Sequence, residues 1–383
     1  MDLTISDEQR LIVDSAAAFL GEASAMRLVR ACSEDGDGFD RSLWRGMAEL
    51  GWCGVRLPAE VGGLGAGWVE LVLLQEQLGR RLACVPFFDS AVLATTVLQA
   101  VPRHHLAMAT LIKLATGELV AALALAQPHA TVDARVTKKG ETWELNGHWR
   151  QIGSAQFADS LLLTARDDRG EPMLFLVPAN TPGLSVEPLA ALDATRRCAD
   201  VSAQALLLPA DACLASGAVL MGLLARTRCL AAITLAAEQV GVAQQALDLT
   251  LAYTMQRVQF GKPIASFQAV KHRCAQMLVA LETARSAVYE AACAADTQPD
   301  PSTLLLYAAQ ARDEATHAAL LCTREAIQLH GGVGFTWEFD PHLYFRRAQV
   351  SSHLLASVGW WREQVAALLL DSEAESLSAV AAA

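Results

Sequence analysis

The sequence predicts an α+β protein in three regions: helical, then β, then helical again. Residues 1–120 carry apolar side chains at helical spacing. Residues 121–214 break into strand-length apolar runs bounded by Gly, Pro, Asn and Asp. From residue 215 the Ala- and Leu-rich helical periodicity returns. We therefore expect an N-terminal helical domain at 1–120, a middle β domain at 121–214 and a C-terminal helical domain at 215–383.

Breaks in each pattern support this division. The loop "LPAEVGGLGAG" at 57–67 holds a proline and four glycines, which prevent a helix from continuing. The runs "TWELNG", "SLLLTAR", "MLFLVP" and "AQALLLP" have the length of strands. In the last region "TQPDP" at 297–301 is the clearest interruption, and it predicts two long helices on either side.

Composition limits the location and the class of the protein. The chain has 383 residues, enough for a large core, and 53% of them are hydrophobic. Its most apolar stretch, 216–238, is interrupted by Arg226 and Arg228, so we expect a buried helix and no membrane span. The N-terminus is acidic at its start and has no basic flank before an apolar stretch, which argues against a signal peptide. We expect a cytoplasmic protein.

Cysteines and charge narrow the possible ligands. Nine cysteines are scattered without a CxxC pair, as is typical of reduced thiols in a core, so we expect neither a metal site nor a disulfide framework. The net charge is -11 without a Lys/Arg cluster. Nucleic acid and anionic membrane surfaces are therefore not expected as partners.

Four segments carry a family pattern. "RVQFGKPIASFQAVKH" at 257–272 gathers many hydrogen-bond donors around a Gly-Lys-Pro turn between two predicted helices. About sixty residues later come "QLHGGVGFTWE" at 328–338 and "FRRA" at 345–348, and the region 43–82 precedes them all. Together, in this order, they resemble the acyl-CoA dehydrogenase family of flavoproteins over essentially the whole chain. That resemblance implies an N-terminal helical domain, a middle β-sandwich or barrel-like domain and a C-terminal four-helix bundle.

The resemblance also implies FAD as cofactor. No GxGxxG motif follows a strand, so the contacts to the dinucleotide must come from helix ends and turns. Arg257 would pair with the pyrophosphate, and Gly331 and Gly332 would let the backbone approach the ADP half. In this family these residues form one wall of a FAD-binding cleft, and that wall contacts the FAD of a neighbouring subunit. The other implied FAD contacts are Gln259, Phe260, Ile264, Phe267, Gln268, Gln328 and Ser357.

Each motif has a structural alternative when taken alone. An Arg at a helix end usually complements the helix dipole, and a Gly pair can be a helix C-cap. Phe260 and Phe267 could belong to a core, and Lys271 with His272 is expected to be an exposed pair without chemistry. The combination in order and spacing favours the cofactor reading.

The catalytic base is missing from its usual places. The family's reaction is an α,β-dehydrogenation of an acyl-CoA thioester, in which a carboxylate removes the α-proton while a hydride passes to the flavin. Most members place a Glu about twenty-four residues after the first Gly of the GG motif, where this chain has Leu355. A minority place it ten residues before Gly241, where this chain has Ala231. The catalytic residue is therefore unknown.

Other polar side chains are poor substitutes for the base. Glu238 shares the helix face of Ala231 but lies about 10 Å further along the axis. Glu338 belongs to the family pattern, and Asp340 precedes a proline in a predicted turn. If residues 353–357 are helical, His353 faces away from position 355. A base at another position stays open as an alternative.

The expected flavin-ring contacts are also altered. The resemblance places Gln151 and Gly153 where the family has a Trp and a Thr that contact the ring. A preceding loop, usually rich in Thr, Glu and Pro, reads "ALAQPHATVDARV" at 124–136. Ala158 and Asp159 are kept as family-like features, so the domain is expected to fold in the usual way.

The surviving motifs favour one half of an unequal pair. Some bacterial members, including those acting on sterol side-chain CoA thioesters, resemble α2β2 assemblies in which one subunit supplies the base. We therefore predict the subunit that lacks the catalytic Glu, with a second dehydrogenase-like subunit and acyl-CoA as partners and electron-transfer flavoprotein as acceptor. The alternatives are an active homo-oligomeric dehydrogenase with an unidentified base and a non-enzymatic scaffold. The sequence does not specify the acyl group.

Overall fold

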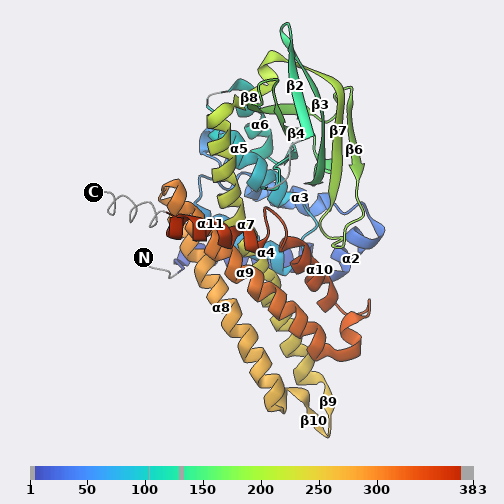
Figure 1. Ribbon diagram of the computed structural model, residues 1–383. Coiled ribbons are helices and arrows are strands. Elements are labelled where there is room, and N and C mark those ends of the chain that lie inside the picture. Colours follow the sequence, from blue (N-terminus) through green and yellow to red (C-terminus); the bar gives the residue numbers. More distant parts are fainter. Residues whose placement is uncertain (1–4, 103, 129–132, 372–383) are drawn as a thin grey trace, which may run out of the picture. The chain divides into compact units, whose positions relative to one another are not determined.

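A computed structural model describes residues 5–102, 104–128 and 133–371 (Figure 1). Contacts divide the chain into two compact units. The helical unit comprises Met1–Leu20, Val72–Leu82 and Ala232–Ala383, and the mixed unit comprises Gly21–Leu71 and Ala83–Ala231. These boundaries cut across the three predicted regions, so the three-domain division stays a prediction.

The order of elements follows the predicted change from helices to strands and back to helices. The α-helices are α1 (Asp7–Ala23), α2 (Met26–Arg30), α3 (Arg41–Glu49), α4 (Trp68–Arg80), α5 (Thr95–Ala100), α6 (His105–Ala115), α7 (Gly217–Gln256), α8 (Gln268–Asp296), α9 (Pro301–His330), α10 (Pro341–Ser351) and α11 (Val358–Ala366). The main strands are β1 (Ala121–Leu123), β2 (Asp133–Lys139), β3 (Thr142–Gly153), β4 (Ser160–Arg166), β5 (Pro172–Pro178), β6 (Leu184–Pro188), β7 (Cys198–Pro209) and β8 (Cys213–Ser216).

Helix α9 begins where the sequence predicts an interruption. Asp300 accepts hydrogen bonds from the backbone N–H groups of Ser302 and Thr303, at 3.0 and 3.1 Å, and Pro301 occupies the first helical turn. The first N–H groups of a helix have no partner within the helix. An acidic N-cap accepts hydrogen bonds from some of them, and proline in the first turn has no N–H to satisfy. The predicted break thus separates the two long helices α8 and α9.

The mixed unit is built around one eight-stranded sheet. Its strand order is β6-β7-β3-β2-β4-β5-β8, and β1 pairs in parallel with β4. Strands β2 and β3 form an antiparallel hairpin, and β3 continues into a long antiparallel pairing with β7. Side chains of Val136, Leu145, Leu163, Phe175 and Val201 lie fully buried in the sheet's core. Strands β4 and β5 are buried along nearly their whole length, and this explains why their sequences are nearly continuous runs of apolar residues.

Two glycines let α4 approach α7 closely inside the helical unit. A Cβ atom added to Gly241 would lie 2.0 Å from the carbonyl oxygen of Glu76, and one added to Gly79 would lie 2.3 Å from that of Glu238. No side chain fits at such distances. The crossing therefore requires glycine on both helices.

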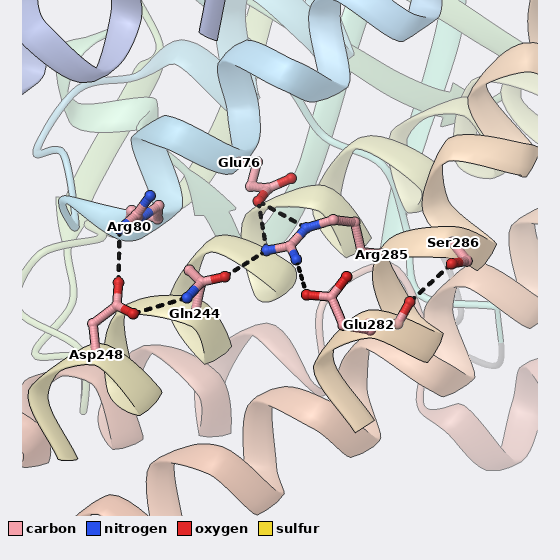
Figure 2. A network of polar contacts seen from close by, with 7 residues as sticks. All are labelled: Glu76, Arg80, Gln244, Asp248, Glu282, Arg285 and Ser286. Atoms are coloured by element: carbon pink, nitrogen blue, oxygen red, sulfur yellow. Dashed lines mark hydrogen bonds and ion pairs between the residues drawn. The ribbon is translucent and has the colours of Figure 1, made fainter. Parts of the chain in front are cut away.

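A polar network ties α4 to α7 and α8 in the same unit (Figure 2). Arg285 donates to Oε1 of Glu76 from Nε at 3.3 Å and from Nη2 at 3.1 Å, and Nη2 also donates to Gln244 at 2.7 Å. Arg80 forms an ion pair with Asp248 at 2.7 Å. Buried carboxylates need such partners, because an unpaired buried charge is costly.

Helix α7 is long and apolar enough to cross a membrane by length and composition. Half of its most apolar window is buried within the fold. Core helices of soluble proteins pass the same test. Ala231 and Glu238 of this helix are both buried. Their burial is consistent with the predicted buried helix.

Candidate functional site

The Gly-Lys-Pro turn forms a small β-hairpin between α7 and α8. Strands β9 (Val258–Gln259) and β10 (Lys262–Pro263) pair antiparallel, with Lys262 opposite Gln259. Between them Phe260 and Gly261 have φ values of 52° and 76°. Two positive φ values in a two-residue loop are typical of a type I′ turn, which matches the twist of paired strands. The chain thus reverses direction within a few residues, and the side chains of the hairpin lie outside the core.

The hairpin brings several predicted cofactor residues together. The backbone N–H of Ile264 donates to the carbonyl oxygen of Arg257 at 2.8 Å and closes the base of the hairpin. The rings of Phe260 and Phe267 meet edge to face at 6.1 Å. Gln259 and Gln268 are both exposed beside them. Phe260 is 91% exposed, although an aromatic ring of this size usually gains stability from burial.

The end of α9 lies next to the end of α7. Tyr253, one turn before Arg257, stacks on His330 with ring centroids 4.3 Å apart. Phe339 packs edge-on against the same tyrosine at 6.2 Å. His330 directly precedes the glycine pair, so this contact places Arg257 and Gly331 at the same end of the helical unit.

A pocket of about 370 Å³ opens at the glycine pair. Gln328, Gly331 and Gly332, which the sequence predicts to contact the ADP half of FAD, line this pocket. A Cβ at either glycine would meet nothing within 4 Å in this chain, and Gly331 has a φ of 65°. Gly331 therefore adopts a backbone conformation that a larger residue would adopt only with strain, and both glycines leave open space beside the backbone.

The same pocket contains residues that sequence reasoning missed. Arg324, Ile327, Phe335 and Phe345 complete its lining. Arg324 lies four residues before Gln328 on α9, so helical spacing alone would have placed the two side chains on one face. Phe335 is 71% exposed and adds a second aromatic surface near the predicted motif.

The position of the usual base lies in a turn that follows α10. Leu355 is 7% exposed, and its φ is 64°. Residues 352–356 form a turn and not a helix, so the helical comparison of His353 with Leu355 does not apply. His353 is nevertheless exposed, whereas Leu355 is buried. Ser357 lies just beyond, where its Oγ accepts a hydrogen bond from the Trp360 N–H at the start of α11.

Arg312 of α9 fixes this turn. It is fully buried, and its Nη2 donates to the carbonyl oxygens of Ser351 at 3.0 Å and Leu354 at 3.4 Å. Its Nη1 donates to Oε1 of Gln239, which also accepts from Thr316. The turn therefore keeps a defined backbone although position 355 carries no titratable group.

The second base position is also without a proton acceptor. Ala231 is 1% exposed on α7. Glu238, further along that helix, accepts hydrogen bonds from Gln75 at 2.9 Å, Arg347 at 3.3 Å and Ser351 at 3.4 Å. These contacts account for Glu238 as a buried structural carboxylate.

Within the mixed unit, the end of β3 departs from the family pattern in a defined way. A Cβ at Gly153 would lie 2.3 Å from Oδ1 of Asp89. The other oxygen of Asp89 accepts a hydrogen bond from Ser154 at 2.5 Å. Gln151 has a φ of 55°, and its N–H donates to Asp200. Asp89 thus occupies the space that a side chain at position 153 would need. Residues 129–132 of the preceding loop lie outside the described residues.

The chain's features can be tested against the needs of FAD. A pyrophosphate needs a cation and N–H donors, and an adenosine needs an apolar surface with close backbone approach. The exposed Arg257, the two glycines and the exposed aromatic rings of Phe260 and Phe335 meet these needs at one end of the helical unit. The residues present there fit the dinucleotide.

Two family models match the chain. The acyl-CoA dehydrogenase N-terminal domain matches residues 6–118, and the acyl-CoA dehydrogenase C-terminal domain matches residues 218–355. Acyl-CoA dehydrogenase IpdE2 of Mycobacterium tuberculosis is 33% identical over 356 residues, which are 93% of this chain and 95% of that relative. The chain belongs to the acyl-CoA dehydrogenase family. Its fold, its FAD cofactor and its class as an oxidoreductase follow from that membership.

Solved acyl-CoA dehydrogenases share the fold of this chain. Butyryl-CoA dehydrogenase of Megasphaera elsdenii superposes with a TM-score of 0.88 at 25% identity, covering 97% of this chain and 100% of that one. A chain of the ChsE4-ChsE5 complex from Mycobacterium tuberculosis gives 0.87 at 26% identity, covering 95% and 98%. A chain of a variant of the Tcur3481-Tcur3483 steroid acyl-CoA dehydrogenase gives 0.83 at 28% identity, covering 97% and 100%.

Proposed function

We propose that this chain is the base-lacking subunit of a heteromeric acyl-CoA dehydrogenase. The observation that carries the proposal is Leu355, an apolar side chain in a well-built turn at the position where most members hold the catalytic Glu. A leucine accepts no proton, and neither does Ala231 at the alternative position. The α-proton of the substrate must therefore be removed by a carboxylate from another chain.

The cofactor is shared between unlike subunits in this proposal. FAD supplies the acceptor for the hydride that leaves the β-carbon. Arg257 binds the pyrophosphate, while Gln328, Gly331 and Gly332 approach the ADP half across the subunit interface. Support comes from the exposure of these groups and from the pocket that the glycines line. The remaining predicted contacts are those of Gln259, Phe260, Ile264, Phe267, Gln268 and Ser357.

The flavin ring is held by the partner subunit. Asp89 fills the space beside Gly153, so this chain offers no side chain at the position of the family's ring-contacting Thr. A partner subunit that keeps the flavin-ring contacts and the catalytic Glu would complete one active site in each pair of unlike subunits.

The substrate is an acyl-CoA thioester, electron-transfer flavoprotein accepts the electrons, and the assembly works in the cytoplasm. Similarity to a steroid acyl-CoA dehydrogenase and to the ChsE4-ChsE5 complex supports a sterol side-chain type of substrate and an α2β2 arrangement.

Anaerobic reduction of the flavin tests the proposal. The purified chain is supplied with FAD and then with short-, long- or steroid-chain acyl-CoA, and loss of the oxidised flavin absorbance is followed with and without the partner. We expect reduction only in the heteromeric assembly. Rapid reduction by the chain alone would show that another residue serves as base. A colourless assembly under every co-expression condition would favour a scaffold.

A further inference from the structure

Two cysteines far apart in the sequence lie side by side in the mixed unit. Cys32 belongs to the π-helical turn Ala31–Asp35 that follows α2, and Cys84 lies in the loop after α4. The two thiols are hydrogen-bond partners. A disulfide requires the two sulfur atoms to approach to about 2.05 Å, so a bond between these thiols needs a rotation of their side chains.

Other contacts hold the two segments together. The N–H of Asp40 donates to the carbonyl oxygen of Cys84 at 2.8 Å. The Cys84 thiol also lies 4.0 Å from the carbonyl oxygen of Val29. Residue 84 thus touches the segment 29–40 through its backbone and its side chain. These contacts hold Cys84 beside the segment that carries Cys32.

The two thiols differ in access and in reactivity. Cys84 is 2% exposed, whereas Cys32 is half-buried and open to small molecules. The hydrogen bond from Cys84 is the largest cause that lowers the pKa of Cys32, and nearby Arg197 also lowers it, against burial and the charges of Asp40 and Asp37. A thiolate is the nucleophilic form of cysteine.

Six of the other thiols are less suited to this chemistry. Burial raises the pKa of Cys53 and Cys322 to about 12 and that of Cys229 to about 11. The pKa values of three more cysteines are also raised, with burial as the first cause: Cys198, Cys213 and Cys274. Oxidation should therefore begin at Cys32 rather than at any of these thiols.

We propose that Cys32 and Cys84 are a redox-active dithiol that hydrogen peroxide converts into a disulfide. The Cys32 thiolate attacks one peroxide oxygen, the O–O bond breaks, and the released hydroxide takes up the proton that Cys32 has lost, giving a sulfenic acid and water. The Cys84 sulfur then attacks the Cys32 sulfur, and hydroxide leaves with the Cys84 proton as a second water. The two thiols lose two electrons, which reduce one peroxide to two waters.

The disulfide would act on a connected part of the mixed unit. Ser33, next to Cys32, accepts a hydrogen bond from Arg197 at 2.8 Å through its carbonyl oxygen. The carbonyl oxygen of Arg197 accepts from the N–H of Ser154 at 2.9 Å, beside the end of β3. Oxidation would therefore constrain the segment around Ser33. Through Arg197 this segment contacts Ser154 at the end of β3.

Thiol counting on the full-length chain tests the proposal. The reduced protein is treated with hydrogen peroxide, unfolded, and titrated with a thiol reagent. We expect the nine thiols of the sequence to fall to seven, and peptide mapping without reductant to yield a linked pair containing Cys32 and Cys84. The Cys274→Ser control should lose two thiols in the same way. Nine remaining thiols, or a linked pair of other cysteines, would overturn the proposal.

Two variants separate the roles of the cysteines. In Cys84→Ser the sulfenic acid at Cys32 persists and is trapped by dimedone, and no linked peptide forms. Because Cys84 is buried, Cys32→Ser provides a second variant at a more open position, and it should lose no thiol under the same treatment. Loss of two thiols in Cys32→Ser would contradict the assignment.

Discussion

Arg312 donates a hydrogen bond from Nη2 to the carbonyl oxygen of Ser351 at 3.0 Å, inside the core of the helical unit. This contact anchors the turn that carries Leu355, so the backbone of the usual base position is maintained without the base. The chain thus keeps the fold of the family and carries a leucine where most members carry a glutamate.

Replacing Arg312 should destabilise the turn and the core together. In Arg312→Met the carbonyl oxygens of Ser351 and Leu354 lose a buried donor, and we expect the free energy of unfolding to fall by about 2 kcal/mol or more. Urea denaturation measures it. The matched control is Arg362→Met, because Arg362 pairs with Asp313 at the surface, where solvent screens an ion pair and it contributes little to stability. Equal effects of the two variants would contradict the anchoring role.

Ala356 has a φ of 148°, a conformation that glycine adopts more readily than alanine. We therefore expect Ala356→Gly to raise the free energy of unfolding by about 1 kcal/mol, since relief of strain exceeds the entropy that glycine adds to the unfolded chain. Ala348→Gly, the same change inside α10, should lower it by a similar amount. A loss of stability in Ala356→Gly would show that the turn carries no strain there.

FAD retention should depend on Arg257. Arg257→Ala removes a charge-assisted contact to the pyrophosphate, an interaction worth about 1.5–3 kcal/mol, so FAD should bind about 10- to 150-fold more weakly to the heteromeric assembly. Gln268→Ala should weaken it less. Flavin absorbance after gel filtration measures retention. Lys271→Ala is the control, because it removes one exposed positive charge near the same hairpin. Equal retention in Arg257→Ala and the wild type would remove the cofactor role from this motif.

His330 should make stability depend on pH. Burial is the main cause that lowers the pKa of His330 below its ordinary value of 6.5, partly opposed by the hydrogen bond to Ala326. The folded chain therefore binds this proton more weakly than the unfolded chain does. Its contribution to stability is fully present above pH 6.5 and is lost as the pH falls through the lowered pKa.

His330→Phe is expected to reduce this dependence, because phenylalanine keeps the stack on Tyr253 and does not titrate. Urea midpoints of the wild type and the variant are compared from about one pH unit above 6.5 to about one unit below. The wild type should lose more stability on acidification. Parallel curves would assign the pH dependence to other groups.

The sequence predicted the order of elements and brought Gln328 and the glycine pair together, because apolar periodicity and short motifs are local properties. It predicted a turn at Gly-Lys-Pro but not the hairpin, in which Phe260 and Gly261 both take positive φ. Long-range contacts could not be read in the same way. The partners of Glu238 come from α4 and α10, and the approach of Asp89 to Gly153 depends on how two distant segments pack. Arg312 carries no local motif that would announce its role.

Native mass spectrometry with flavin quantification tests the partner-subunit account most directly. The chain is co-expressed with a dehydrogenase-like partner from its own genome that carries a Glu at the base position. The account predicts a yellow heterotetramer with about one FAD per unlike pair, because only the partner's ring site is complete. Binding of FAD to the assembled state also stabilises that state by mass action. A homotetramer of this chain that holds one FAD per subunit and turns over acyl-CoA would contradict it.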